Sequence, residues 1–451
     1  MRQGLGGGTL PFGFLAAGLL AVLAVPSGRA AEMFADPPSS RPEITIQEVL
    51  DEAEAFSPQI KAMLAQEKEA KNNVAVSESF LMPELTGVLD RAEGMLGQNA
   101  ELGPMGMRRF VVEPFYEGTA YGLMGHWRIL DLPRYYAIKV AKRQLDYRRA
   151  LTALARYHVD VDVANAYFQA AGYKGLAAAW KEVGAYMYDV MVKEVRPLMR
   201  SGYQNPVDEL LVKDEVTEAG IEKAMNEARY RDALKELASF MGKNSPNFSI
   251  PVPLSFSSGA VAFFAPGVSP YIKVTQSNLE VSKNFVKETR SQNYPIIHAT
   301  GGLGGATNLP QADEGRNVVG GFGVELPIFL GFRIVEQTEA AENQVIQRKA
   351  ETDNAQLEID VGTAKIDQVI DAAVKAVGRL AGEFSDDQRA LKLARYRYTN
   401  FQGPLVDVRE SLRDLARVRA EQNIEVSQLY FGKCAKALLN GGTLPAKASH
   451  T

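Results

Sequence analysis

Two acidic residues late in the chain, Asp407 and Glu410, are three positions apart in a stretch rich in helix-forming residues. Positions i and i+3 share one face of a helix, so both carboxylates could act on the same ion. Asp208 holds a similar place in the first half, shortly after Pro206, as Asp407 follows Pro404. Because proline favours the first helical turn and carboxylates stabilise its positive end, helix capping is the competing interpretation of these acids.

The other residues that could do chemistry do not form a site. The run Gly301-Gly302-Leu303-Gly304-Gly305 resembles a phosphate loop but lacks the following Lys-Ser/Thr, so strand packing is favoured. His158 and Asp162 are spaced i, i+4, yet four histidines and one cysteine give no ligand cluster. We therefore expect no catalytic residue, cofactor or bound metal, and a protein that is not an enzyme.

Composition limits the possible partners. The 451 residues carry a formal net charge of −4, so the chain has no excess of positive charge that would attract nucleic acid. Cys434 is the only cysteine, so an intramolecular disulfide is excluded. We expect it to be a small, partly buried residue on a helix.

The N-terminus is typical of a secretory signal peptide. Arg2 precedes an apolar run at 14–25, and small residues lead to a cleavage site after Ala30. A single-span anchor is the alternative, but the run is shorter than the ~20 residues that a spanning helix needs. The prediction is a signal peptide at 1–30 and no later transmembrane helix.

The two halves of the chain repeat one another. Ser57-Pro58-Gln59-Ile60-Lys61 returns as Ser269-Pro270-Tyr271-Ile272-Lys273, and Pro83 returns as Pro295 at the same offset of 212 residues. Such self-similarity indicates a duplicated structural unit. We predict a first repeat at 31–243, a linker at 244–268, a second repeat at 269–440 and a tail at 441–451.

Long proline-free tracts predict long helices in each repeat, with helical hairpins at about 133–243 and 332–440. Within the second tract, apolar residues recur every seven positions. This heptad seam comprises Ile359, Ile366, Ala373 and Leu380 with the interleaved Thr363, Ile370 and Val377. A heptad repeat favours supercoiling against neighbouring helices, so we predict coiled-coil projections.

Between the helical tracts, alternation of apolar and small or polar residues predicts strand hairpins at about 84–130 and 296–328. The strands have about the ~9–11 residues that cross a bilayer. Four strands cannot close a barrel, since small barrels need about eight, so the chain must oligomerise. Trp127, near a strand end, could anchor at the membrane interface or pack in a core.

These elements together resemble the TolC-like outer-membrane efflux proteins. The resemblance is carried by Met82-Pro83-Glu84-Leu85, by the strand-to-helix segment 323–333, and by the hairpin turns at 201–208 and 398–407. It implies a mainly α fold with a small β part, in which three chains complete a twelve-stranded barrel in outer-membrane lipid and an α-barrel in the periplasm. It also implies a passive exit duct that docks with a periplasmic adaptor and an inner-membrane pump of the RND or ABC type.

The resemblance also assigns roles at the hairpin turns. It implies a periplasmic constriction at Asp407, Glu410 and Asp208, where acidic rings would select cations, and a closed-state contact at Tyr398. The turns themselves contain Gly202, Pro206, Gly403 and Pro404. Phe401 stands where the family has glycine, and Gly403 where it has a basic residue, which puts the closed-state lock in question. The alternative function is a non-transporting periplasmic coiled-coil scaffold of the same fold.

Overall fold

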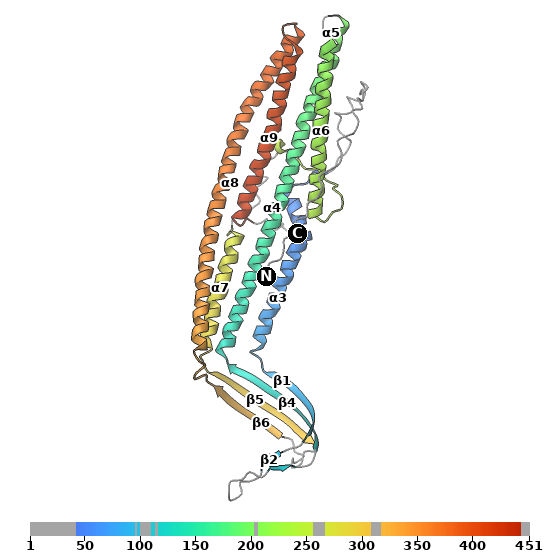
Figure 1. Cartoon of the computed structure of the whole chain (residues 1–451). Coiled ribbons are helices and arrows are strands. Elements are labelled where there is room, and N and C mark those ends of the chain that lie inside the picture. The colour runs from blue at the N-terminus through green and yellow to red at the C-terminus, as the bar shows by residue number, and fades with distance from the viewer. Residues whose placement is uncertain are drawn as a thin grey trace, which may run out of the picture. The chain divides into compact units, whose positions relative to one another are not determined.

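The computed structural model describes residues 42–94, 97–99, 110–112, 116–202, 206–255, 267–307 and 317–442 (Figure 1). They divide into two compact units. The hairpin unit comprises Leu176–Glu227 and Gly382–Ala420, and the sheet unit comprises the described parts of Arg41–Gly175, Ala228–Ala381 and Glu421–Thr451. The predicted signal peptide at 1–30 and most of the predicted tail lie outside the described residues.

The chain is mainly helical, as the sequence predicts. The helices are α2 (Ile46–Phe56), α3 (Pro58–Ser79), α4 (Leu132–Val190), the π-helix η1 (Met191–Val195), α5 (Arg196–Arg200), α6 (Pro206–Phe240), the 3-10 helix η2 (Pro253–Ser255), α7 (Pro270–Ser291), α8 (Arg333–Thr399) and α9 (Leu405–Leu439). Within the described residues, no helix is long and apolar enough to cross a membrane.

The repeated Ser-Pro pair marks the start of a helix in both halves. α3 begins at Pro58, where Ser57 Oγ accepts a hydrogen bond from the Ile60 N–H at 3.4 Å, and α7 begins at Pro270. Proline suits this position because the first N–H groups of a helix lack internal acceptors. The motif therefore sets where each repeat's helix starts.

Four strands form one curved antiparallel sheet in the sheet unit (Figure 1). They are β1 (Glu84–Gly94), β4 (Tyr116–Leu130), β5 (Ile296–Thr307) and β6 (Asn317–Glu325), in the order β1-β4-β5-β6. The β4–β5 pair joins the strands of the first predicted repeat to those of the second. The strands of both halves of the chain thus form one continuous sheet.

The strand hairpin predicted at about 84–130 also contains a short strand pair. β2 (Gly97–Asn99) pairs with β3 (Phe110–Val112), a pairing that the sequence does not predict. Three-residue strands carry too little alternation to be distinguished from loop residues by their pattern.

The two faces of the four-stranded sheet differ in polarity. The alternation of strand residues puts an apolar set on one face: Leu85, Leu89, Leu123, Trp127, Leu303, Val318, Phe322 and Val324. These side chains are strongly exposed, with 81% of Leu89 and 83% of Phe322 accessible. The opposite face carries Glu84, Thr86, His126, Arg128, His298, Thr300 and Glu325. Within the described residues of this chain, the apolar face of the sheet is therefore exposed rather than covered by other elements.

The helices of the sheet unit bury a core of aliphatic and small residues. Its members come from α2, α4, α6 and α9, among them Leu50, Val163, Leu237 and Cys434. Cys434 is buried on α9, and burial raises the pKa of its thiol to about 12, so the cysteine is an inert packing residue. Ile359, Ala373 and Leu380 of the heptad seam are buried along α8, which confirms that the seam faces other helices.

Candidate functional site at the ends of the helical hairpins

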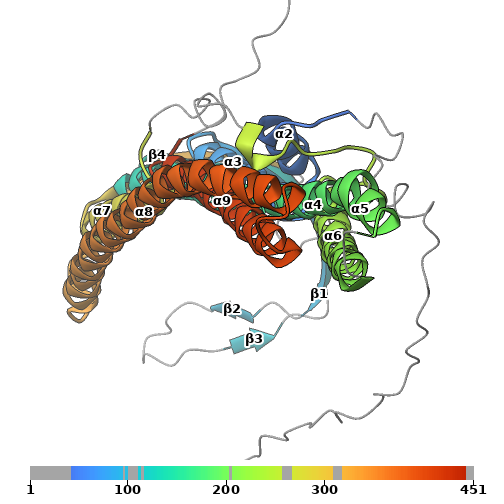
Figure 2. The same ribbon diagram turned by 90° about the horizontal axis from the view of Figure 1, so that it is seen from above.

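Two helical hairpins lie side by side in the hairpin unit. One is formed by the end of α4, η1, α5 and the start of α6, and the other by the end of α8 and the start of α9 (Figure 2). Met187, Val212, Leu391 and Leu412, one from each of the long helices, share a buried apolar cluster. Burial of this cluster is what holds the two hairpins together.

The two hairpins turn in different ways. In the first, α5 ends at Arg200, Gly202 takes a left-handed backbone with φ of 74°, and α6 begins at Pro206. Residues 203–205 of this turn lie outside the described residues. In the second, α8 ends at Thr399 and α9 begins at Leu405, directly after Pro404. The predicted turn residues therefore do lie at the two turns.

Phe401 occupies the left-handed position that ends α8. Its φ is 58°, its N–H donates to the Tyr398 carbonyl at 3.1 Å, and the Gln402 N–H donates to the Arg397 carbonyl at 2.7 Å. This pair of bonds is a Schellman motif, whose left-handed residue is usually glycine. The substitution noted in the sequence thus leaves a bulky residue in a backbone conformation that disfavours side chains.

Tyr398 connects the two hairpins. The side chain is fully buried, and its hydroxyl donates to Asp208 Oδ2 at 3.4 Å. Asp208 lies in the first turn of α6, where the helix dipole favours a carboxylate. Burial raises the pKa of Asp208, and the hydrogen bond from Tyr398 partly offsets this rise. The sequence singled out both residues, and the structure brings them together.

Asp407 and Glu410 do not meet Asp208 through any contact that the described residues show. Asp407 lies in the first turn of α9, with Oδ2 at 4.0 Å from Nη1 of Arg397. Gly403 lies beside the same two side chains. Glu410 is exposed one turn further along α9. The two carboxylates of the pair are thus both accessible to solvent, and one has a basic neighbour.

Two partly buried ion-pair networks between the hairpins were missed by the sequence reasoning. Arg395 of α8 contacts Glu194 of η1, with Nε 2.6 Å from Oε1, and lies 3.5 Å from the Tyr186 hydroxyl. Arg413 of α9 donates to both oxygens of the buried Glu215 of α6, at 3.1 and 2.8 Å.

One signal in the sequence could have found these networks. Their partners are separated by 201 and 198 residues, close to the offset of 199 between Asp208 and Asp407. In the hairpin unit, residues about 199 positions apart lie beside each other, so opposite charges at that offset are candidates for pairing.

Comparison with known proteins identifies the fold of the chain through solved structures, not through sequence. No protein-family model matches the chain, and no curated protein matches its sequence. Among solved structures, the outer membrane protein VceC from Vibrio cholerae superposes with a TM-score of 0.70 at 18% identity, covering 89% of this chain and 97% of that one. The chain has the fold of the outer-membrane channels.

Two further structures support this assignment of the fold. The CmeC outer membrane channel of Campylobacter jejuni has a TM-score of 0.67 at 14% identity, over 93% of each chain. The open state of the MtrE outer membrane channel of Neisseria gonorrhoeae has a TM-score of 0.68 at 14% identity, covering 89% of this chain and 93% of that one. The TolC-like resemblance of the sequence is confirmed at the level of the fold.

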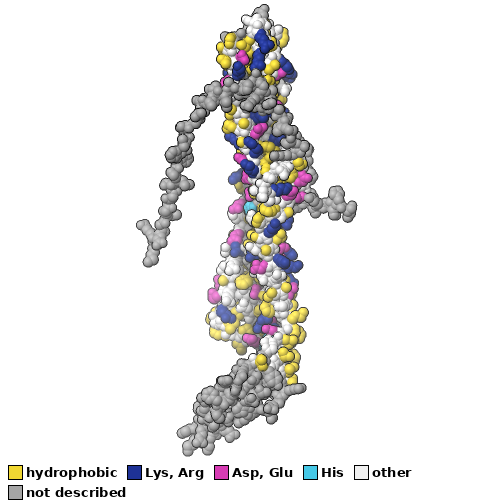
Figure 3. All heavy atoms as spheres, turned by 90° about the vertical axis from the view of Figure 1, so that its right-hand side faces the viewer, with side chains coloured by type: hydrophobic (Ala, Val, Ile, Leu, Met, Phe, Trp, Pro, Cys, Tyr) yellow, Lys and Arg dark blue, Asp and Glu magenta, His cyan; other side chains and the backbone are white. Residues whose placement is uncertain are grey.

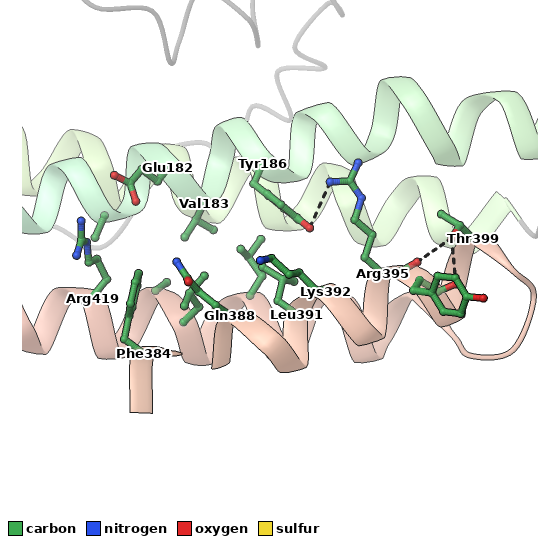
Figure 4. A pocket seen from close by; sticks show the side chains of 15 residues that line it. Glu182, Val183, Tyr186, Phe384, Gln388, Leu391, Lys392, Arg395, Thr399 and Arg419 are labelled. Atoms are coloured by element: carbon green, nitrogen blue, oxygen red, sulfur yellow. Dashed lines mark hydrogen bonds between the residues drawn. The ribbon is translucent and has the colours of Figure 1, made fainter. Parts of the chain in front are cut away.

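The hairpins of this channel fold enclose a pocket of about 630 Å³ between α4 and the α8–α9 hairpin (Figure 4). Its floor is apolar, with Val183, Leu391 and Leu412, and its polar rim includes Lys392 and Arg419. The side chains of the two hairpins point toward one another across it. The pocket contains no cluster of metal-binding side chains among the described residues.

The outer surface of the helices is mixed in charge. On the face seen in Figure 3, basic and acidic side chains are interspersed along the helices. Many of them form exposed pairs three or four residues apart, such as Lys235 with Asp232 at 2.9 Å. This pattern is typical of solvated helices.

Trp127 is on the apolar face of the sheet of this channel fold. It is 43% exposed, and its Nε1–H donates to the Leu81 carbonyl at 3.0 Å. Within this single chain the Trp127 ring is therefore partly exposed and is not packed in a core. An exposed ring with a hydrogen-bonded N–H is the arrangement expected of an interfacial anchor.

Proposed function

We propose that the chain is an outer-membrane channel that works as a passive exit duct. The observation that carries the proposal is the four-stranded sheet. Within the described residues, β1 and β6 each pair with one strand only, so both edges of the sheet are open. One face of the sheet is apolar and exposed. A sheet with an apolar outer face and no free edge is one of the two structures that lipid tolerates, so this sheet calls for closure in a bilayer.

Closure is supplied by further copies of the chain. We propose a homotrimer, because three sheets of four strands give the twelve strands that the resemblance implies. β1 at one edge of each sheet could then pair with β6 at the edge of the next copy. Exposed apolar side chains also flank the two edge strands in the chain: Leu81 and Met82 precede β1, and Phe329 and Phe332 follow β6. These would be covered by neighbouring copies or by outer-membrane lipid.

The hairpin ends would form the periplasmic opening of the duct. We assign Asp407, Glu410 and Asp208 to the constriction, where three copies would present rings of carboxylates that favour cations. The accessibility of Asp407 and Glu410 supports this role, whereas Asp208 is held by Tyr398. Tyr398 would then stabilise one state of the opening by fixing the two hairpins of a chain to each other.

The partners proposed for the duct are a periplasmic adaptor and an inner-membrane pump. The support is the likeness in fold to VceC, CmeC and MtrE together with the sequence resemblance. The pump would supply the energy and select the cargo.

The experiment is expression of the full chain, fractionation of the membranes and reconstitution in planar bilayers. The expected results are processing of residues 1–30, a trimer in the outer-membrane fraction, and ion conductance by the purified trimer. A monomer recovered from the periplasm would contradict the proposal and favour the alternative of a non-transporting scaffold. The open, apolar-faced sheet argues against the scaffold, which would need no such surface.

A further inference from the structure

We propose that His126 and His298 form a binding site for a transition-metal ion, Cu²⁺, Ni²⁺ or Zn²⁺, on the polar face of the sheet. His126 is on β4 and His298 is on β5, and both side chains are half-buried. Their ring centres are 5.4 Å apart, and the ring planes are inclined by 31°. Imidazole nitrogens are common ligands of these three metals.

The strand register explains why two residues so distant in sequence meet. His126 is opposite Thr300 and Arg128 is opposite His298, so the histidines are diagonal neighbours on one face of the β4–β5 pair. Diagonal positions are within reach of long side chains. Because this pair joins the two repeats, neither half of the chain contains the site by itself.

The separation of the rings fits two ligands of one ion. A zinc–nitrogen bond of about 2.0–2.1 Å puts the metal ~3.2 Å from each ring centre, and a tetrahedral angle then separates the centres by ~5 Å. The observed 5.4 Å is close to that value. No large movement of the backbone is therefore needed to bring both imidazoles to one ion.

The neighbouring strand makes room for one of the rings. Gly323 on β6 is directly opposite His298, and a Cβ added there would lie 2.4 Å from His298 Nε2. Only glycine leaves the space that this imidazole occupies. An alanine at this position would displace the ring and alter its distance from His126.

The rest of the coordination shell would be water. Within the described residues, no three His, Cys, Asp or Glu side chains are grouped closely enough to hold a metal ion. Among residues whose side chains the structure describes, the charged ones on the same face are Glu84 on β1, Arg128 on β4 and Glu325 on β6. A two-imidazole site prefers Cu²⁺ over Ni²⁺, binds Zn²⁺, and has little affinity for Ca²⁺ or Mg²⁺, which require oxygen ligands.

Metal binding by the chain does not depend on the proposed function, whereas the location of the site in a channel lumen does. In a closed barrel the apolar face contacts lipid, so the histidine face lines the lumen. Three copies would then place three ions around the passage and add positive charge to it. Cation current should fall when the sites fill.

The test is Cu²⁺ binding to the full chain, purified in detergent through a tag without histidine and stripped with a chelator. Calorimetry should give one Cu²⁺ per chain, and electron paramagnetic resonance should show two nitrogen ligands. His126→Gln and His298→Gln should each weaken binding by at least the ~10–100-fold that loss of an outer-shell partner costs. Gly323→Ala should also weaken it, because the ring is displaced.

The matched control is His158→Gln, which removes an exposed histidine on α4 and should leave binding unchanged. All variants are first checked for normal helicity and oligomeric state. Cu²⁺ binding that persists in both His126→Gln and His298→Gln, or that Ca²⁺ displaces at equal concentration, would overturn the site. A bilayer lacking any current would instead contradict the proposed function and leave the binding result standing.

Discussion

The hydroxyl of Tyr398, in the last turn of α8, lies 3.4 Å from Oδ2 of Asp208, in the first turn of α6. The sequence analysis singled out several side chains at the two turns. Among the described residues, this is the one hydrogen bond that joins two of them. The rest of the Tyr398 side chain is fully buried in the apolar cluster shared by the hairpins. Packing and hydrogen bonding at this residue therefore act together.

Tyr398→Phe should separate these two contributions. The ring stays packed, but the hydrogen bond is lost, which should lower the local stability by about 1 kcal/mol. The measurement is hydrogen exchange of backbone amides in the first turn of α6, which should become faster in the variant.

Asp208→Ala and the double variant complete the comparison, because alanine leaves no side-chain acceptor for the Tyr398 hydroxyl. Each single substitution already removes the shared hydrogen bond. If that bond couples the two residues, the double variant should therefore lose less stability than the sum of the two single losses. Strictly additive effects of the two substitutions would show that Tyr398 and Asp208 are not coupled.

Phe401→Gly should stabilise the end of α8. The left-handed backbone at φ of 58° costs a non-glycine residue ~1–2 kcal/mol, and part of this is offset by the greater freedom of glycine in the unfolded chain. A net gain of about 1 kcal/mol is expected, measured as slower hydrogen exchange of the Gln402 amide, which closes the turn.

Gly202→Ala is the matched control for Phe401→Gly. Gly202 has φ of 74° at the other turn, and no atom of the described residues lies within 4 Å of an added Cβ, so the expected effect is backbone strain. It should destabilise its turn by about 1 kcal/mol. Faster exchange in Phe401→Gly would contradict the prediction. It would mean that contacts of the Phe401 ring stabilise the turn by more than the left-handed backbone destabilises it.

The fold was predictable because its signals are periodic and local. The heptad seam of Ile359, Ala373 and Leu380 and the period-two strands each repeat over many residues, so the pattern survives individual exceptions. The Ser-Pro motif marked the starts of α3 and α7 for the same reason.

The contacts of the candidate site were less accessible to sequence reasoning. Arg395 with Glu194 and Arg413 with Glu215 depend on how two hairpins pack, and no local pattern around any of these residues distinguishes them from surface charges. The pairing of His126 with His298 likewise requires the register between β4 and β5, which the turn and loop lengths of two different repeats set jointly.

Asp160→Asn should change how stability varies with pH. Asp160 is buried on α4, its Oδ1 has no hydrogen-bond partner among the described residues, and burial together with the nearby Glu54 raises its pKa to about 8. Between the ordinary aspartate value of about 4 and pH 8, the folded chain keeps a proton that the unfolded chain has lost. Stability should therefore fall as pH rises through this window and level off above it.

The asparagine variant lacks that proton and should show a flatter profile. The measurement is thermal unfolding in detergent at steps from pH 4.5 to pH 8.5, with Asp162→Asn, an exposed carboxylate two residues further along α4, as control. The control should keep the wild-type slope. Parallel profiles for wild type and Asp160→Asn would show that Asp160 is already charged at neutral pH.

Asp407→Ala with Glu410→Ala should weaken the preference of the reconstituted channel for cations. Three copies would lose six carboxylates at one constriction, and acidic rings at a narrow point attract cations and repel anions. The reversal potential across a salt gradient measures the effect, which should move toward zero. Neutralisation should also make selectivity less dependent on ionic strength, since fewer fixed charges remain to be screened.

The control for this pair removes two exposed carboxylates elsewhere, by Asp232→Ala with Glu236→Ala on α6. The change in net charge is identical, so a reversal potential that moves equally in both double variants would assign selectivity to the charge of the whole protein. A shift confined to the Asp407 and Glu410 variant would assign it to the hairpin ends. Because Asp407 already lies 4.0 Å from Arg397 Nη1, the Glu410 substitution alone should produce the larger part of the shift.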